Sequence, residues 1–239
     1  MTEKEKMLTG QVYDCSDSEL LTQWHKAKNL IRDYNQTDSE NLQEKECILN
    51  ELLGGRGKNL WITPPFYVDY GNNIYLGNNC EINMNCTFLD DNKIMIGDNA
   101  LIAPNVQIYT AFHPTNAADR FGELNEDNSF QFCKTQTAPV TIGDNVWIGG
   151  GAIILPGVTI GDNSIIGAES LVTKDIPAGE IWGGIPARYI GTTTDFAEKC
   201  LKETPLYDEK QIKINRRQEI ERILNIDCGK EKNSQKVEK

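Results

Sequence analysis

The chain has 239 residues, a formal net charge of −11 and a pI near 4.7. Its length is enough for one large domain with its own core, and its acidity excludes nucleic acids and acidic membranes as expected partners, since both attract clustered Lys and Arg. The opening MTEKEKMLTGQVYDCSDSELL contains no apolar core of a signal peptide, and no run of about 18 apolar residues follows. We therefore expect a cytoplasmic protein without membrane segments.

The seven cysteines are scattered, odd in number and without a C-x-x-C pair. This pattern predicts free thiols in a reducing compartment. A zinc site requires several Cys or His at ligand spacing, which two isolated histidines and unpaired cysteines do not supply. We therefore expect no metal.

Residues 16–34 predict an amphipathic helix, with Ser16 and Glu19 spaced as a capping box. Its apolar residues recur on one face: Leu20, Trp24, Ala27, Ile31 and Tyr34. His25 lies in this helix, and we expect it to be a solvated side chain without a catalytic role.

A second amphipathic stretch, residues 39–53, stops at Gly54 and Gly55, a usual signal for a helix end. Residues 1–58 are therefore expected to form an N-terminal two-helix segment that lies as a lid beside the next region. The segment WITPPFYVDYGNN, residues 61–73, leads into that region.

A six-residue repeat occupies the middle of the chain. From residue 142 it reads IGDNVW, IGGGAI, ILPGVT, IGDNSI, IGAESL and VTKDIP, and the same register appears upstream at residues 76 and 96. This spacing suits neither a helix nor a simple alternating strand. It predicts an all-β solenoid over residues 59–190, in which each hexad is a short strand plus a corner and three hexads form one coil of 18 residues.

Each hexad position has a predicted role. The aliphatic first residue points inward and stacks between coils, at the ~4.8 Å spacing of strands. The fifth residue must be small because it faces inward near a corner, so Cys80 and Cys86 at this position are packing residues. Gly and Asn at positions two and four permit positive φ. We count about four coils, with a two-residue slip near residues 90–94, and expect so short a solenoid to pack against other copies.

Two segments fall outside the repeat. Residues 109–139 interrupt it as a protruding loop, and a loop of this size is usually functional. Residues 191–239 predict a C-terminal helical extension, with helices at DFAEKCLKE and near residues 210–224, followed by a polar, disordered tail.

With the repeat, the motifs EKMLTG, PPFYVDYG, NMNCTFLDD, IAPNVQIYTAFHP and GGIPARYIG make the chain resemble the maltose and galactoside O-acetyltransferases of the hexapeptide-repeat superfamily. The resemblance covers about residues 4–190. It implies a left-handed parallel β-helix, an exception to the right-handed crossover rule. It also implies a homotrimer with active sites between subunits, and acetyl transfer from acetyl-CoA to a hydroxyl of a small sugar.

The resemblance gives His113 the role of general base. A sugar hydroxyl is a poor nucleophile until its proton is removed, and imidazole titrates near working pH. We expect His113 to take that proton as the hydroxyl attacks the thioester carbonyl of acetyl-CoA directly, and to return it to the CoA thiolate. The alternative is a loop histidine that only satisfies its own hydrogen bonds.

The resemblance also implies two sets of binding residues. The acceptor sugar is assigned four residues whose carboxylates and amide can hold hydroxyls: Asp14, Asp69, Asn83 and Asp91. For each of these, the alternative role is to cap a turn or corner. Glu81 stands where relatives often carry an aromatic residue, which leaves the identity of the acceptor open. The loop of residues 109–139 is expected to cover the neighbouring acceptor site, with Phe130 or Phe132 as a contact.

The donor, acetyl-CoA, is assigned a groove between neighbouring solenoids. Its residues are Gly150, Ala168, Thr173, Lys174 and Arg188. The backbone N–H of Gly150 is expected near the thioester oxygen, and Arg188 on a phosphate. Gly191 stands where relatives often have a second basic residue.

Three other functions share part of this pattern. A γ-class carbonic anhydrase shares the fold but needs three histidines at zinc, and this chain has two. An acetyltransferase for an antibiotic or an amino sugar would use the same chemistry on another acceptor. A non-catalytic assembly module would use the solenoid and the C-terminal extension as a scaffold.

Overall fold

The computed structural model describes residues 1–121 and 134–203, and it begins with three helices. They are α1 (Glu3–Leu8), α2 (Ser18–Gln36) and α3 (Leu42–Leu52). The buried residues of α2 include Leu20, Ala27, Ile31 and Tyr34, as its apolar face predicted, whereas Trp24 is only partly buried. The sequence did not predict α1, since six residues are too few to display a helical period.

The predicted capping box of α2 is wrong. The N-cap is Asp17, whose carboxylate accepts the backbone N–H groups of Glu19 at 3.0 Å and Leu20 at 3.3 Å. Ser16 instead donates its hydroxyl and its backbone N–H to Asp14. An aspartate caps as well as a serine, and its negative charge suits the positive end of the helix.

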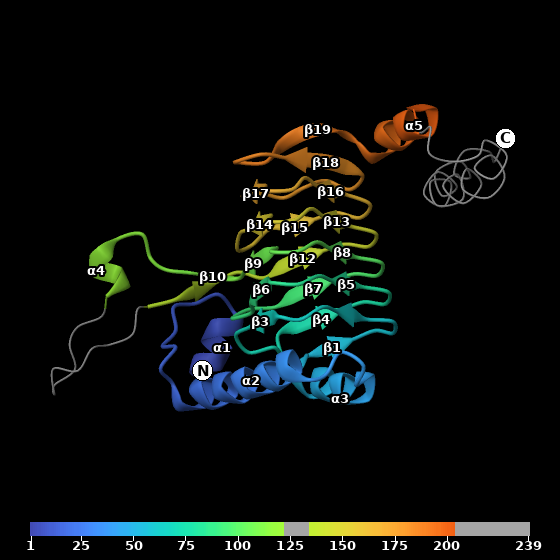
Figure 1. Ribbon diagram of the computed structural model, residues 1–239. Coiled ribbons are helices and arrows are strands. Elements are labelled where there is room, and N and C mark those ends of the chain that lie inside the picture. The colour runs from blue at the N-terminus through green and yellow to red at the C-terminus, as the bar shows by residue number, and fades with distance from the viewer. Residues whose placement is uncertain (122–133, 204–239) are drawn as a thin grey trace, which may run out of the picture. The chain divides into compact units, whose positions relative to one another are not determined.

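Parallel strands then wind into the predicted all-β solenoid (Figure 1). The first sheet contains β1 (Gly55–Arg56), β4 (Ile74–Leu76), β7 (Ile94–Ile96), β12 (Val140–Ile142) and β15 (Thr159–Ile160). The second contains β2 (Trp61–Ile62), β5 (Glu81–Ile82), β8 (Leu101–Ile102), β13 (Trp147–Ile148), β16 (Ile165–Ile166), β18 (Glu180–Gly183) and β19 (Arg188–Thr192). The third contains β3 (Phe66–Val68), β6 (Cys86–Leu89), β9 (Gln107–Tyr109), β14 (Ile153–Ile154) and β17 (Leu171–Val172).

Three stacked corners join the sheets. The first corner, between the first and second sheets, consists of residues 57–60, 77–80, 97–100, 143–146 and 161–164. The second corner, between the second and third sheets, consists of residues 63–65, 83–85, 103–106, 149–152 and 167–170. The third corner, between the third and first sheets, consists of residues 69–73, 90–93, 155–158 and 173–175, and of the described residues within 110–139.

The solenoid has more coils than the repeat predicted. Five coils have a strand in every sheet and β18 begins a sixth, where we expected about four. The hexad count did not include the coil of β1, β2 and β3, because its two prolines and aromatic residues do not follow the hexad pattern. The expected two-residue slip is confirmed: Ile74 pairs with Ile94, 20 residues on, whereas Ile142 pairs with Ile160, 18 residues on.

The inward positions agree with the prediction. The first residues of the hexads are buried: Ile142, Ile148, Ile154, Ile160, Ile166 and Val172. The fifth residues are buried as well: Val146, Ala152, Val158, Ser164, Ser170 and Ile176. Cys80 and Cys86 are buried free thiols, which confirms them as packing residues.

Glycine and asparagine have different roles at the first corner. Asn145 has φ of 58° and Asn163 has φ of 59°, as predicted for position four. Gly143, at position two, does not have a positive φ. It is needed because a Cβ atom there would lie 2.1 Å from Oδ1 of Asp162 in the next coil. Close stacking of coils, not backbone conformation, therefore selects this glycine.

The regular coils are interrupted at the third corner. A hairpin leaves the solenoid there, formed by β10 (Ala111–Phe112) and β11 (Gln136–Thr137), with α4 (Ala117–Arg120) beyond it (Figure 1). The loop contacts predicted for Phe130 and Phe132 lie outside the described residues.

The segment after the solenoid is a separate unit, residues 191–239. Its helix α5 (Thr193–Glu203) confirms the helix predicted at DFAEKCLKE, while the one predicted near residues 210–224 lies outside the described residues. Within the described parts of both units, no helix is long and apolar enough to cross a membrane.

Candidate active site

His113 directly follows β10 on the protruding hairpin, and its ring is held from the opposite strand. Its Nδ1 lies 2.9 Å from the carbonyl oxygen of Lys134 and 3.5 Å from the hydroxyl of Thr135. A carbonyl oxygen can only accept a hydrogen bond, so Nδ1 is the donor, and in the neutral imidazole the lone pair is then on Nε2. The imidazole is exposed. This geometry prepares Nε2 to take a proton from a bound molecule.

A pocket of about 460 Å³ lies where the N-terminal segment meets the third corner. Its lining residues are Cys15, Leu21, Trp24, His25, Asp69, Tyr70 and Asp91. Two of the four predicted acceptor residues, Asp69 and Asp91, therefore share one cavity. His25 is exposed, as expected, but it also lines this pocket. The sequence could not show this, because it does not reveal that α2 packs beside the third corner.

Asp69 has a cationic partner from α2. Its Oδ1 accepts hydrogen bonds from Nζ of Lys28 at 2.8 Å and from the indole N–H of Trp24 at 3.2 Å. Nζ of Lys28 also bonds the carbonyl oxygen of Val68 and lies 4.8 Å from the centre of the Trp24 ring. The negative charge of Asp69 is thus balanced, and its carboxylate is fixed in orientation.

Asp91 has a neutral partner instead. The hydroxyl of Tyr13 donates a 2.6 Å hydrogen bond to its Oδ1. Burial raises the pKa of Asp91 to about 6, although the Tyr13 bond and the charge of Lys28 lower it. The two carboxylates of the pocket therefore differ, because one is paired with a cation and the other titrates near neutral pH.

Asp90 is a supporting residue that the sequence analysis missed. It is completely buried, and it accepts the backbone N–H groups of Asp69 at 3.0 Å, Tyr70 at 2.9 Å and Asn73 at 3.3 Å. Burial raises its pKa to about 7, against the hydrogen bonds, which lower it. These bonds fix the backbone that carries Asp69. The pair of adjacent aspartates was the available signal, but only burial reveals which one faces the pocket.

Asp14 does not line the pocket. Its carboxylate accepts the backbone N–H and the hydroxyl of Ser16, and its own N–H donates to Glu3 at 2.7 Å. The next residue, Cys15, reaches the pocket instead. Within one chain, Asp14 therefore stabilises the turn before α2.

The remaining acceptor residue and part of the donor set lie on the second corner. Asn83 is there, with its side-chain amide 3.4 Å from Oε1 of Glu81, and so are Gly150 and Ala168 in later coils. The Gly150 carbonyl accepts the N–H of Glu169, while the Gly150 N–H has no hydrogen-bond partner within residues 1–121 and 134–203. One chain therefore does not bring Asn83 and Gly150 to the corner that carries His113.

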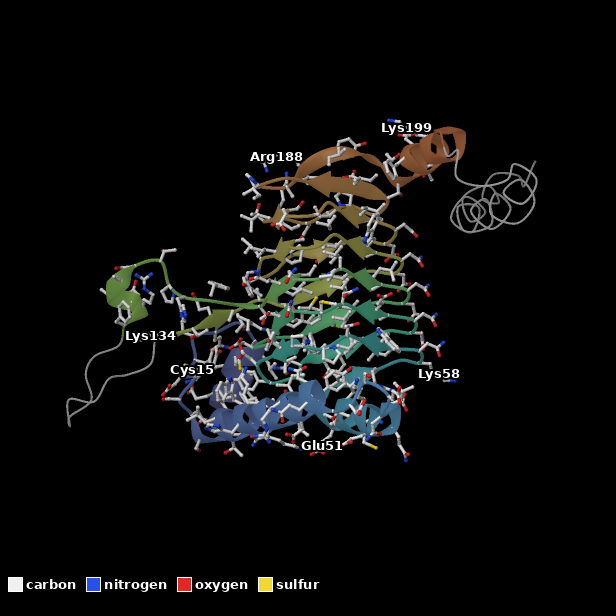
Figure 2. All side chains as sticks on the ribbon, in the orientation of Figure 1. Cys15, Glu51, Lys58, Lys134, Arg188 and Lys199 are labelled. Atoms are coloured by element: carbon white, nitrogen blue, oxygen red, sulfur yellow. The ribbon has the colours of Figure 1, made fainter. Side chains whose placement is uncertain are left out.

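The other residues predicted to bind the donor lie near the end of the solenoid. Thr173 and Lys174 are exposed on the third corner, and Arg188 is exposed at the start of β19. Nζ of Lys174 lies 4.8 Å from the ring centre of Trp182, which is 8% exposed and covers the end of the core. Cys15, Lys134 and Arg188 occupy the side of the solenoid from which the hairpin projects, and Lys58, on the first corner, occupies the other (Figure 2).

These residues suit an anionic, phosphate-bearing donor such as CoA. Lys174 is an exposed cation on the third corner, which also carries His113, Arg188 is an exposed cation at the start of β19, and Gly150 supplies an open amide donor. No group of three His, Cys, Asp or Glu side chains in the described parts of the chain could hold a metal ion.

Two family models match the sequence. The maltose acetyltransferase hexapeptide capping motif matches residues 6–57, and the bacterial transferase hexapeptide of six repeats matches residues 139–174. Among curated proteins, the galactoside O-acetyltransferase of Escherichia coli (strain K12) is 38% identical over 191 residues, which is 80% of this chain and 89% of that protein.

Two solved acetyltransferase structures are also similar to this chain. A maltose O-acetyltransferase from Clostridium difficile 630 is 47% identical, with a TM-score of 0.73 over 80% of this chain and 97% of that one. A galactoside acetyltransferase in complex with coenzyme A is 35% identical, with a TM-score of 0.76 over 87% of this chain and 97% of that one.

Proposed function

Because the chain belongs to the maltose and galactoside O-acetyltransferase family of left-handed β-helix enzymes, we propose that it moves an acetyl group from acetyl-CoA to a hydroxyl of a small sugar, with His113 as general base. The observation that supports this role of His113 is the bond between Nδ1 and the Lys134 carbonyl, which in the neutral imidazole leaves the lone pair on Nε2. Nε2 accepts the proton of the sugar hydroxyl while that oxygen attacks the thioester carbonyl. The same proton then passes to the departing thiolate, and no acyl-enzyme forms.

The acceptor pocket supports a polyhydroxylated substrate. Asp69 and Asp91 offer carboxylate oxygens to sugar hydroxyls, and their partners from the N-terminal segment hold them in place. Fixing the sugar in this way would bring one hydroxyl within reach of His113. We assign Asp14 to acceptor binding at the rim of this pocket, next to Cys15.

We assign the second-corner residues to the active site of a neighbouring subunit in a homotrimer. Asn83 then supplies an amide to the acceptor, and Gly150 supplies an N–H to the thioester oxygen. Ala168, Thr173, Lys174 and Arg188 line the CoA groove. Large apolar residues on the outer face of the second sheet support subunit packing, because Trp61, Leu101 and Trp147 are 58%, 48% and 49% exposed in the single chain.

The same chemistry on an amino sugar is the second candidate. Glu81 is exposed on β5, beside Asn83, and no cation pairs with it among the described residues. A carboxylate in this place would attract a protonated amine on the acceptor. None of the cysteines whose side chains the structure describes, Cys15, Cys47, Cys80 and Cys86, is in a disulfide, which is compatible with a reducing cytoplasm.

Release of CoA thiol from acetyl-CoA tests the proposal. Glucose, maltose, a galactoside, glucosamine and chloramphenicol would be compared as acceptors, using wild type, His113→Ala and Thr115→Ala. Thr115 is exposed in the same loop and serves as the matched control. We expect sugar-dependent release that falls by about 100-fold or more in His113→Ala and stays unchanged in Thr115→Ala. Absence of release with every acceptor, from a folded trimer, would favour a non-catalytic assembly module.

A further inference from the structure

Tyr13 connects two parts of the proposed site, the acceptor pocket and the hairpin that carries His113. Its side chain is 2% exposed, and its hydroxyl donates to Oδ1 of Asp91 at 2.6 Å. Its backbone N–H donates to the carbonyl oxygen of Thr135 at 3.1 Å. One residue of the N-terminal segment is thus bonded to the acceptor pocket through its side chain and to the His113 hairpin through its backbone.

We propose that Tyr13 is a positioning residue that fixes Asp91 in orientation and in place relative to His113, and so sets acceptor affinity. This inference rests on the proposed function. Tyr13 does not line the pocket, so it acts through Asp91 and not by touching the sugar.

The hydroxyl of Tyr13 orients the carboxylate of Asp91, as Lys28 orients the carboxylate of Asp69. Within residues 1–121 and 134–203, no Lys or Arg lies within ion-pair distance of Asp91, and Tyr13 is its side-chain hydrogen-bond donor. The bond occupies Oδ1 and leaves Oδ2 for a hydroxyl of the acceptor. A phenol is a suitable donor here, because it orients the carboxylate without forming an ion pair that would compete with the substrate.

The backbone of Tyr13 fixes the distance to the base. Thr135 follows Lys134, whose carbonyl oxygen lies 2.9 Å from Nδ1 of His113, and the Thr135 hydroxyl lies 3.5 Å from the same nitrogen. The path from Asp91 to His113 therefore consists of one tyrosine and two adjacent residues of the hairpin. A shift of Tyr13 would move the acceptor carboxylate relative to the proton acceptor, and small misplacements are costly in catalysis.

The pH dependence of acceptor binding follows from the groups around Asp91. These are Tyr13 and Cys15 from the N-terminal segment, His25 and Lys28 from α2, and Asp69 and Tyr70 from the preceding coil. Of these, the Tyr13 bond and Lys28 lower the pKa of Asp91, whereas Asp69 raises it. Removal of the Tyr13 hydroxyl would raise that pKa further above about 6. As the pH falls, Asp91 would then become protonated at a higher pH.

The test compares Tyr13→Phe with Tyr34→Phe. Tyr34 is an equally buried tyrosine, and its hydroxyl donates at 2.7 Å to the carbonyl oxygen of Ile62, away from the site. We expect Tyr13→Phe to raise acceptor KM by about tenfold, as for loss of a hydrogen bond to a charged group, with the KM for acetyl-CoA unchanged. The acid limb of kcat/KM for the acceptor should move to higher pH. Tyr34→Phe should show neither effect.

A double-mutant cycle with Asp91→Asn separates positioning from a general loss of stability. If Tyr13 acts through Asp91, its substitution should add little to Asp91→Asn. Should Tyr13→Phe fail to fold, 3-fluorotyrosine at position 13 keeps the hydroxyl and makes it a stronger donor. The acid limb should then move to lower pH.

Carboxyl ¹³C NMR of Asp91, assigned by its loss in Asp91→Asn, gives a readout that needs no turnover. A higher Asp91 pKa in Tyr13→Phe supports the proposal even if no tested sugar is acetylated, and that failure would count against the proposed function alone. An unchanged Asp91 pKa, or acceptor kinetics equal to those of Tyr34→Phe in an active enzyme, would overturn it.

Discussion

The first and third corners of the solenoid are built from the same polar residue types but use them differently. At the first corner, Oδ1 of Asp162 accepts the backbone N–H of Asp144 at 2.9 Å, and Oδ1 of Asp144 accepts that of Asp98 at 2.7 Å. The asparagines form a parallel ladder, with Asn99 bonded to Asn145 at 2.9 Å. Each coil thus satisfies the polar groups of the previous one, so the corner is structural.

The third corner breaks the repeat. Asp90 still accepts backbone N–H groups of the preceding coil, but several neighbouring polar side chains have partners outside the regular coils. Asp69 and Asp91 are held by Lys28 and Tyr13 of the N-terminal segment, and His113 is held by its own hairpin. Such partners fix the orientation of each group while leaving further oxygen or nitrogen lone pairs available. The regular first corner is therefore structural, whereas the interrupted third corner carries the groups to which we assign the chemistry in the proposed function.

Subunit mixing tests whether the third corner works only with the second corner of a neighbour. His113→Ala and Asn83→Ala should each lose about 100-fold in activity. After the two are unfolded together and refolded, random trimers should contain intact sites at about a quarter of positions, and activity should return accordingly. The control is a mixture of the separately refolded variants. Activity no higher than in that control would show that the two residues do not meet across subunits.

Stability should depend on the glycine of the first corner and not on Gly191, which lies in β19. A Cβ atom at residue 143 would lie 2.1 Å from Oδ1 of Asp162, whereas one at residue 191 would meet nothing within 4 Å. Gly143→Ala should therefore lower the free energy of unfolding by about 2–3 kcal/mol, and Gly191→Ala should not. Thermal unfolding gives the comparison. Equal melting temperatures would contradict close stacking as the reason for the glycine.

The aspartates of the two corners should change stability with pH in opposite directions. The pKa of Asp91 is raised to about 6, so its favourable contribution is complete below pH 3.8 and is lost as pH rises through 6. Asp91→Asn should therefore stabilise the protein by about 1–2 kcal/mol at pH 8 and not at pH 3.5. Backbone and side-chain hydrogen bonds from Asn78 lower the pKa of Asp98, so Asp98→Asn should destabilise above pH 3.8. Urea unfolding at several pH values would measure both stability changes. If both variants were stabilised, or both destabilised, at high pH, the proposed difference between the two corners would be refuted.

Lysines on α2 give the smallest expected effects. Lys28→Met removes the cation from Asp69, and acceptor KM should rise by about tenfold with little change in the KM for acetyl-CoA. Lys26 pairs with Glu51 on the exposed surface at 2.9 Å, and Lys26→Met should change neither constant. Steady-state kinetics of both variants provide the check. Equal effects would mean that Lys28 is merely a surface charge.

Most of the fold could be predicted from the sequence, because each hexad repeats the same pattern of inward-facing residues. Six hexads with an aliphatic first residue and a compact fifth residue define the inward face, and the structure buries both sets. The coil containing Pro64 and Pro65 was missed, since there the same backbone path is taken by residues that do not display the period. The N-cap of α2 was misassigned by one residue, because Ser16 and Asp17 are both good caps and only the chain's path decides between them.

The repeat and the motifs were enough to predict the solenoid, the family and the candidate residues His113, Asp69, Asn83 and Asp91, because these depend on local pattern. Which of these residues lie together depends on how the chain packs in three dimensions. This packing brings Asp69 and Asp91 into one pocket, leaves Asn83 on another corner, and joins Asp91 to His113 through Tyr13. Contacts between residues as distant as Tyr13 and Asp91 have no sequence period. They arise only when the N-terminal segment packs on the corner where the repeat is interrupted.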